Sequence, residues 1–96
     1  MSSMIIGVCT LEFHLPACRS LKEKRKFLSS FRTRVSNRFN VAVSEVDHHD
    51  RWQRTTIGLV SLAAGREPID KMFQKILGEA ERQGEAQLIS VNIEFL

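Results

Sequence analysis

Two segments of the chain are apolar at almost every position, which is typical of strands buried on both faces. Residues 4–15 begin as an uninterrupted apolar run, and residues 53–64 contain a second one from Ile57 to Ala64. Residues 39–47 and 87–95 instead alternate between apolar and polar side chains, as strands with one buried face do. In the last strand the residues expected to face the core are Ile89, Val91, Ile93 and Phe95. We expect the first two segments at the centre of a sheet.

Two further segments carry apolar residues at intervals of three and four, the period of a helix with one buried face. The first spans residues 20–37, and its apolar stripe consists of Leu21, Leu28, Phe31 and Val35, widened by Phe27. Ser20 should cap this helix, because its hydroxyl can accept a hydrogen bond from the amide of Glu23, whose carboxylate can bond back. The second helix spans residues 67–83, with Pro68 in its first turn. Its stripe consists of Ile69, Met72, Phe73, Ile76, Leu77 and Ala80.

The order of these elements predicts an α+β fold, the ferredoxin-like β-α-β-β-α-β plait, with a four-stranded antiparallel sheet and both helices on one face. Ninety-six residues are enough for one domain with a modest core, so we expect residues 1–96 to form a single domain. In this topology the start of the first helix and the hairpin between the second and third strands share one edge. Residues 19–26 and 47–54 should therefore be neighbours.

The first strand predicts an uncovered apolar surface. Cys9, Leu11 and Phe13 lie on one face of it, and Ile6 and Val8 lie on the other. Two helices can cover only one face of such a sheet. Because contiguous exposed apolar surface is unusual on a monomer, we expect a homo-oligomer formed through the open sheet face.

Basic residues are concentrated in one part of the chain. Between Arg19 and Arg38 lie eight basic residues and one acid, Glu23, so this segment carries +7, the whole chain +3 and the remainder −4. The block RSLKEKRK puts several cations in the first helical turns, where the helix dipole disfavours each by roughly 0.3–1 kcal/mol. Such a helix start attracts phosphate or carboxylate groups. The alternative is a solvated face on which Lys24 or Arg25 lays its aliphatic stem over the core edge.

The predicted hairpin carries histidines and the chain's single tryptophan. His48 and His49 could bind a metal or transfer a proton, but adjacent residues of an extended chain point in opposite directions, and no nucleophile or carboxylate pair accompanies them. We therefore expect no metal, no cofactor and no catalytic residue. A lone tryptophan such as Trp52 more often closes a core or fills an interface than stacks a nucleic-acid base. Arg54 is a candidate contact in either case.

Signals for membrane insertion and secretion are lacking. No apolar run approaches the roughly 18 residues of a membrane span, and the N-terminus has no recognisable secretory signal, so we expect a cytoplasmic protein with no membrane partner. Cys9 and Cys18 form neither a disulfide framework nor a C-x-x-C motif, and we expect both to be free thiols.

Two blocks of the sequence resemble the YlxP-like family of small bacterial proteins, a domain of unknown function. One is S-L-K-E-K-R at residues 20–25, and the other is E-V-x-H-x-D-x-W-Q-R at residues 45–54. The resemblance covers nearly the whole chain. It implies a ferredoxin-like fold, a cytosolic bacterial protein and, through gene neighbourhood with translation and ribosome-maturation factors, a connection with RNA or the ribosome. It supplies no reaction and no catalytic residue.

The leading hypothesis is a non-catalytic module that binds RNA or a ribonucleoprotein through a basic edge. The candidate anion- or nucleic-acid-binding residues are Arg19, Ser20, Lys22, Lys24, Arg25, Lys26, Arg51, Trp52, Gln53 and Arg54, with Glu45, His48 and His49 as accessory residues. The chain lacks the paired sheet aromatics of the RNA-recognition plait and the G-x-x-G loop of KH domains, so recognition should use the edge. The alternative is a small enzyme or sensor that binds an anionic metabolite there, although the glycine-rich loop of acylphosphatases is missing.

Overall fold

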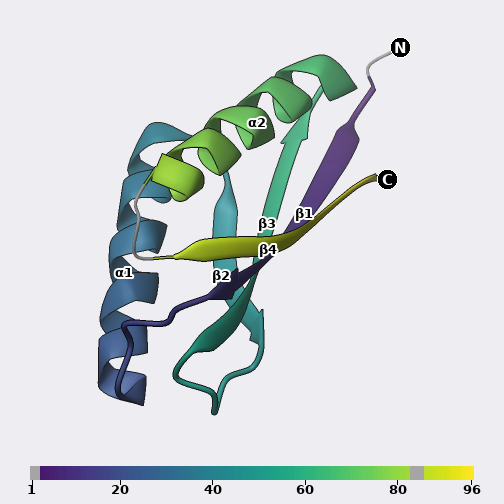
Figure 1. Cartoon of the computed structure of the whole chain (residues 1–96). Coiled ribbons are helices and arrows are strands. Elements are labelled where there is room, and N and C mark those ends of the chain that lie inside the picture. The colour runs from purple at the N-terminus through teal and green to yellow at the C-terminus, as the bar shows by residue number, and fades with distance from the viewer. Residues whose placement is uncertain (1–2, 83–85) are drawn as a thin grey trace.

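The computed structural model describes residues 3–82 and 86–96, which form four strands and two helices in the predicted order. The elements are β1 (Ile5–His14), α1 (Leu21–Arg38), β2 (Ala42–Asp47), β3 (Arg54–Ala63), α2 (Arg66–Arg82) and β4 (Gln87–Phe95). Figure 1 shows one sheet with the two helices packed against it. The fold is the predicted ferredoxin-like α+β plait. Residue 83, where we expected the second helix to end, lies outside the described residues.

The sheet has the order β2-β3-β1-β4, and each neighbouring pair is antiparallel. β1 and β3 pair along their full length, from Ile5 opposite Ala63 to His14 opposite Arg54. These two strands occupy the central positions, as their continuous apolar runs predict. Because β1 ends where β3 begins, the residues that lead into α1 lie beside the β2–β3 hairpin.

Both helices cover the same face of the sheet. A Cβ atom on Gly7 of β1 would lie 2.4 Å from Cγ2 of Ile69 in α2. The ring of Phe13, on the same face of β1, lies 6.1 Å from the ring of Phe27 and 6.0 Å from that of Phe31 in α1. Since alternate residues of a strand share a face, both helices lie on one side of the sheet, α2 over the Gly7 end of β1 and α1 over its Phe13 end, and the core is buried between them and the sheet.

The start of α1 agrees with the predicted capping pattern. Ser20 is extended, and its Oγ accepts a hydrogen bond from the backbone N–H of Glu23 at 3.1 Å. The Glu23 carboxylate in turn accepts one from the backbone N–H of Arg19. Neither helix of the described residues has the length and apolar character that a membrane span requires.

The second strand starts later than predicted. We expected it from residue 39, but β2 begins at Ala42. Phe39 instead caps α1, because its backbone N–H donates to the carbonyl of Val35 at 2.9 Å. The apolar side chain of Phe39 is half-buried against the core without being part of the sheet.

The alternation of β4 is interrupted by a bulge. Phe13 pairs with Leu88 while Glu12 pairs with Ser90, so Ile89 is an extra residue between them. Leu88 consequently packs against the core, and Ile89 is 49% exposed. The prediction that Ile89 faces the core is therefore wrong, since the inserted residue puts Leu88 on the core side, whereas Ile93 and Phe95 after the bulge pack against the core as predicted.

The face of the sheet opposite the helices carries exposed apolar side chains. Val60 and Leu62 of β3 pair with Val8 and Ile6 of β1 on this face and are 43% and 55% exposed. Met4, just before β1, is 65% exposed. The uncovered apolar surface that β1 predicts is therefore present, and self-association through it stays a prediction.

Candidate functional site

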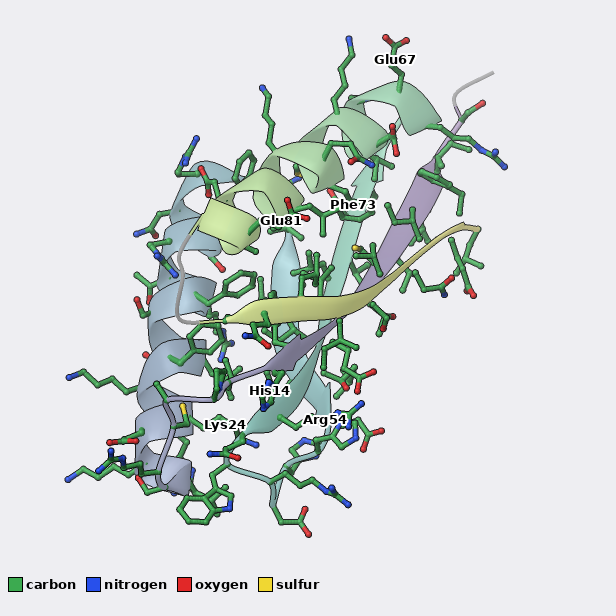
Figure 2. All side chains as sticks on the ribbon, viewed as in Figure 1. His14, Lys24, Arg54, Glu67, Phe73 and Glu81 are labelled. Carbon is green, nitrogen blue, oxygen red and sulfur yellow. The ribbon has the colours of Figure 1, made fainter. Side chains whose placement is uncertain are left out.

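Lys24 lies inside the protein and not on the predicted binding surface. Its side chain is 1% exposed, and Nζ lies 2.9 Å from Oε2 of Glu45. The ammonium group also donates to the backbone carbonyls of His48 at 2.7 Å and His49 at 3.1 Å, with the carbonyl of Arg54 at 3.5 Å. Its three protons thus have three close acceptors. Figure 2 shows Lys24 and Arg54 at the same end of the sheet.

Glu45 completes this buried network from β2. Its Oε2 also accepts a hydrogen bond from Oγ1 of Thr55 at 2.6 Å, so α1, β2 and β3 meet at this carboxylate, while the hairpin carbonyls contact the other member of the ion pair. A buried charge is tolerated when it is paired and hydrogen-bonded, as both partners are here. Lys24 is consequently engaged within the fold, and we remove it from the candidate binding residues. The sequence held a signal for this, because Lys24 falls between Leu21 and Leu28 in the apolar stripe of α1.

His48 gives the hairpin a defined conformation. Its φ of 63° lies in the left-handed region, which costs energy for a residue with a side chain. Several bonds offset that cost. Its N–H donates to Oδ1 of Asp47 at 2.7 Å, and its Nδ1 is hydrogen-bonded to Oγ1 of Thr56 at 2.9 Å. Its carbonyl accepts from Lys24 and, at 3.1 Å, from the backbone N–H of Arg51.

Gln53 and Arg54 are also engaged within the protein. Gln53 Nε2 donates to the carbonyls of Pro16 at 3.3 Å and Cys18 at 3.2 Å, which ties the hairpin to the connection before α1. Arg54 Nε donates to Oε1 of Glu12 at 2.6 Å in an ion pair between β3 and β1. These two candidates hold the hairpin in place.

Five of the basic candidates are exposed at this end of the molecule: Arg19, Lys22, Arg25, Lys26 and Arg51. None of their side chains has an ion-pair or hydrogen-bond partner within residues 3–82 and 86–96. The cations of Arg38 and Arg54, by contrast, are paired with Glu79 and Glu12. The contacts of Lys24 with the hairpin confirm that the two basic segments are neighbours.

Trp52 lies at the surface of the hairpin. Its side chain is 50% exposed and is not part of the buried core, so the interpretation that it closes the core is wrong. It lines a shallow hollow of about 400 Å³ together with His14, Asp50, Arg51, Gln53 and Arg54. His14 was absent from the predicted site, although the pairing of His14 with Arg54 follows from the strand register.

A groove of about 500 Å³ runs between α1 and the edge strand β2. Leu28, Phe31 and Val43 line its apolar part, and Arg25 and Arg32 line its polar part. Arg32 is exposed and adds a second cation to this groove, which lies on a different side of α1 from the hairpin. The sequence places Arg32 in the basic segment without assigning it to the site, because a charge count does not say which cations line a cavity.

The histidines and cysteines have no arrangement that suggests metal chemistry. No group of three or more His, Cys, Asp or Glu side chains in the described part of the chain could hold a metal ion. Neither Cys9 nor Cys18 is in a disulfide. Burial raises the pKa of the Cys9 thiol to about 11, which keeps it neutral and poorly nucleophilic at physiological pH.

Comparison with known proteins identifies the family. Residues 6–93 match the family described as "Protein of unknown function (DUF503)". The chain belongs to this family. It is also 40% identical over 73 residues to "Uncharacterized protein YlxP" of Bacillus subtilis (strain 168), an alignment that covers 76% of this chain and 79% of that protein. The resemblance found in the two sequence blocks is thereby confirmed.

Two solved structures share the fold of this DUF503 member. Protein SO0527 from Shewanella oneidensis aligns with a TM-score of 0.54 at 11% identity, covering 100% of this chain and 91% of that one. The de novo designed protein Foldit4 aligns with a TM-score of 0.50 at 14% identity, covering 98% and 97%. At such identities the likeness concerns the fold alone.

Proposed function

We propose that this DUF503 protein is a non-catalytic module that binds RNA or a ribonucleoprotein through the basic edge formed by Arg19, Lys22, Arg25, Lys26 and Arg51. The observation that carries the proposal is the absence of a partner for these five exposed side chains within the described residues. Near the start of α1 the unpaired cations also oppose the helix dipole, an unfavourable arrangement that a bound polyanion would relieve.

Binding of this kind is mainly electrostatic. Each phosphate that a Lys or Arg neutralises releases counterions, so the affinity should fall steeply as salt is added. Ribosomal RNA and its assembly intermediates fit the implied link with translation, and we propose that the protein acts in the bacterial cytoplasm.

Charge reversal tests the proposal. The variant Lys22→Glu, Arg25→Glu, Lys26→Glu changes three exposed residues and leaves the buried Lys24 in place. We expect it to bind a ribosomal RNA fragment at least roughly tenfold more weakly than the wild type, with a salt slope reduced by about 2. Fluorescence anisotropy at several salt concentrations measures both quantities.

A matched control reverses three cations elsewhere. The variant Arg66→Glu, Lys71→Glu, Lys75→Glu makes the same change of net charge on the exposed side of α2. It should retain most of the affinity, since its residues lie outside the basic edge. Circular dichroism shows whether both variants are folded. Equal losses in the two would mean that net charge alone matters, and an unchanged affinity of the α1 variant would refute the proposal.

The α1–β2 groove supports a second candidate, a sensor or small enzyme for an anionic metabolite. Arg25 and Arg32 beside an apolar floor suit a small ligand with an anionic group and an apolar part. Thermal-shift measurements with a panel of phosphorylated and carboxylated metabolites test this. Stabilisation at micromolar concentration that is lost in Arg32→Ala would favour the metabolite, whereas no stabilisation favours RNA.

We also propose that the protein self-associates through the open sheet face. Its support is the exposed apolar surface of Met4, Val60 and Leu62, which a second copy of the same face would remove from water. Analytical ultracentrifugation should detect a dimer that Leu62→Lys dissociates. A monomeric wild type at high micromolar concentration would refute this proposal.

A further inference from the structure

The exposed ring of Trp52 is the feature of the basic edge that charge does not explain. A tryptophan side chain is the largest apolar group in proteins, and this one is 50% exposed on a turn surrounded by polar residues. Because the indole ring is left in water, the protein does not gain the large favourable free energy of removing this apolar surface from water. A ligand that offers a flat aromatic surface would recover it.

The hairpin that carries Trp52 is ordered before any ligand binds. Lys24 holds the carbonyls of His48 and His49, and Gln53 holds those of Pro16 and Cys18. These bonds anchor the turn on both sides of Trp52 to the start of α1. A ligand therefore meets a platform whose backbone loses little freedom on binding.

The charges beside the ring suit a nucleotide. Arg51 precedes Trp52, is exposed, and has no side-chain partner within residues 3–82 and 86–96. The hollow next to the ring is shallow, about 400 Å³, and its lining is polar, with Arg51 and Arg54 as cations and Asp50 as the one acidic residue. An aromatic face that adjoins a free cation is the combination by which proteins bind single strands, because the base stacks and the phosphate pairs with the charge.

We propose that Trp52 stacks on one unpaired base of a single-stranded RNA while Arg51 contacts an adjacent phosphate. This inference rests on the proposed RNA-binding function and narrows it to single-stranded segments, because a base inside a duplex has both faces covered by its neighbours. Lys24 and Gln53 act as positioning residues that hold the platform. In this arrangement the exposed cations of α1 contact further phosphates of the RNA backbone, beyond the hairpin.

Intrinsic fluorescence tests the stacking directly. The chain has one Trp and no Tyr, so its indole fluorescence reports on Trp52 alone. A 12-residue uridine oligonucleotide should quench this emission as it binds. Inorganic polyphosphate, which supplies the negative charges without bases, should bind to the same cations without a comparable quench.

Affinity measurements with variants complete the test. Trp52→Ala should weaken binding of the oligonucleotide by about 5- to 100-fold, and Trp52→Phe should restore much of the loss because phenylalanine also stacks. Gln74→Ala is the control, since it removes an exposed side chain of α2 that lies outside both the basic edge and the open sheet face, and it should leave the affinity unchanged. Unfolding curves show whether the variants are equally stable.

The outcomes separate this inference from the proposed function. If the wild type binds the oligonucleotide without quenching and Trp52→Ala binds as tightly, stacking is refuted while the charge-based function stands. A quench of equal size with polyphosphate would also refute it. If the wild type binds no RNA at all, the proposed function fails and the stacking fails with it.

Discussion

The ammonium group of Lys24 lies 2.9 Å from the carboxylate of Glu45 in the interior of the protein. Lys24 belongs to the first of the two sequence blocks that resemble the family, and Glu45 opens the second. The blocks are therefore joined by a buried ion pair that fixes the start of α1 against the β2–β3 hairpin. This contact holds the start of α1, with its exposed cations, beside the hairpin that carries Trp52.

We predict that Lys24→Met destabilises the fold by roughly 3–5 kcal/mol. Methionine keeps the apolar stem of the side chain but leaves the Glu45 carboxylate and the hairpin carbonyls without their donor, and an uncompensated buried charge is costly. Urea unfolding followed by circular dichroism measures the change. Lys22→Met, two residues earlier and exposed, is the control and should shift the free energy of unfolding by less than about 0.5 kcal/mol. Equal stability of the two variants would contradict the structural role of Lys24.

Two glycines should respond to alanine in opposite ways. A Cβ atom at Gly7 would lie 2.4 Å from Ile69 and 3.1 Å from Phe73, so Gly7→Ala should cost about 1–3 kcal/mol by forcing α2 away from β1. A Cβ atom at Gly78, within α2, has no atom within 4 Å. Gly78→Ala should therefore stabilise the protein by about 0.5–1 kcal/mol through helix propensity. Thermal unfolding of both variants would show opposite shifts of Tm, and a stabilising Gly7→Ala would mean that α2 packs less closely on β1.

The Cys9 thiol should make the protein less stable in alkaline solution. Its pKa is about 11 in the folded protein because of burial, compared with 9.0 ordinarily. The raised pKa means that the unfolded chain loses this proton first. The stabilising contribution of the neutral Cys9 thiol is therefore fully present below pH 9. It is lost as the pH rises toward 11, which lowers the free energy of unfolding by on the order of 2 kcal/mol.

The variant Cys9→Ala isolates that contribution. It should be less stable than the wild type at pH 8, because a buried side chain is shortened, but its stability should fall less between pH 8.5 and 10.5. Val43→Ala serves as the comparison, because it shortens a buried side chain that does not titrate, and it should retain the pH dependence of the wild type. Urea unfolding at closely spaced pH values measures the slopes, and parallel slopes for the wild type and Cys9→Ala would contradict the assignment.

The fold was predictable because its signals are local and repeated. The apolar runs of β1 and β3 predicted their central positions, although the face of these strands opposite the helices is uncovered, and the three-and-four spacing from Ile69 to Ala80 identifies α2. The bulge at Ile89 was not predictable, because one inserted residue depends on how β4 pairs with β1 and leaves no mark in its own alternation.

The candidate site was only partly predictable from the same pattern. The sequence by itself determined that the basic residues cluster and, through the plait topology, that the start of α1 adjoins the hairpin. Only the tertiary structure decided which of these side chains face solvent. Lys24 turns inward because Glu45 and two carbonyls together satisfy its charge, whereas Lys22 and Arg25 have no such acceptors and stay exposed. The exposure of Trp52 likewise depends on contacts between segments far apart in the sequence, because the core is built from both helices and all four strands and does not include it.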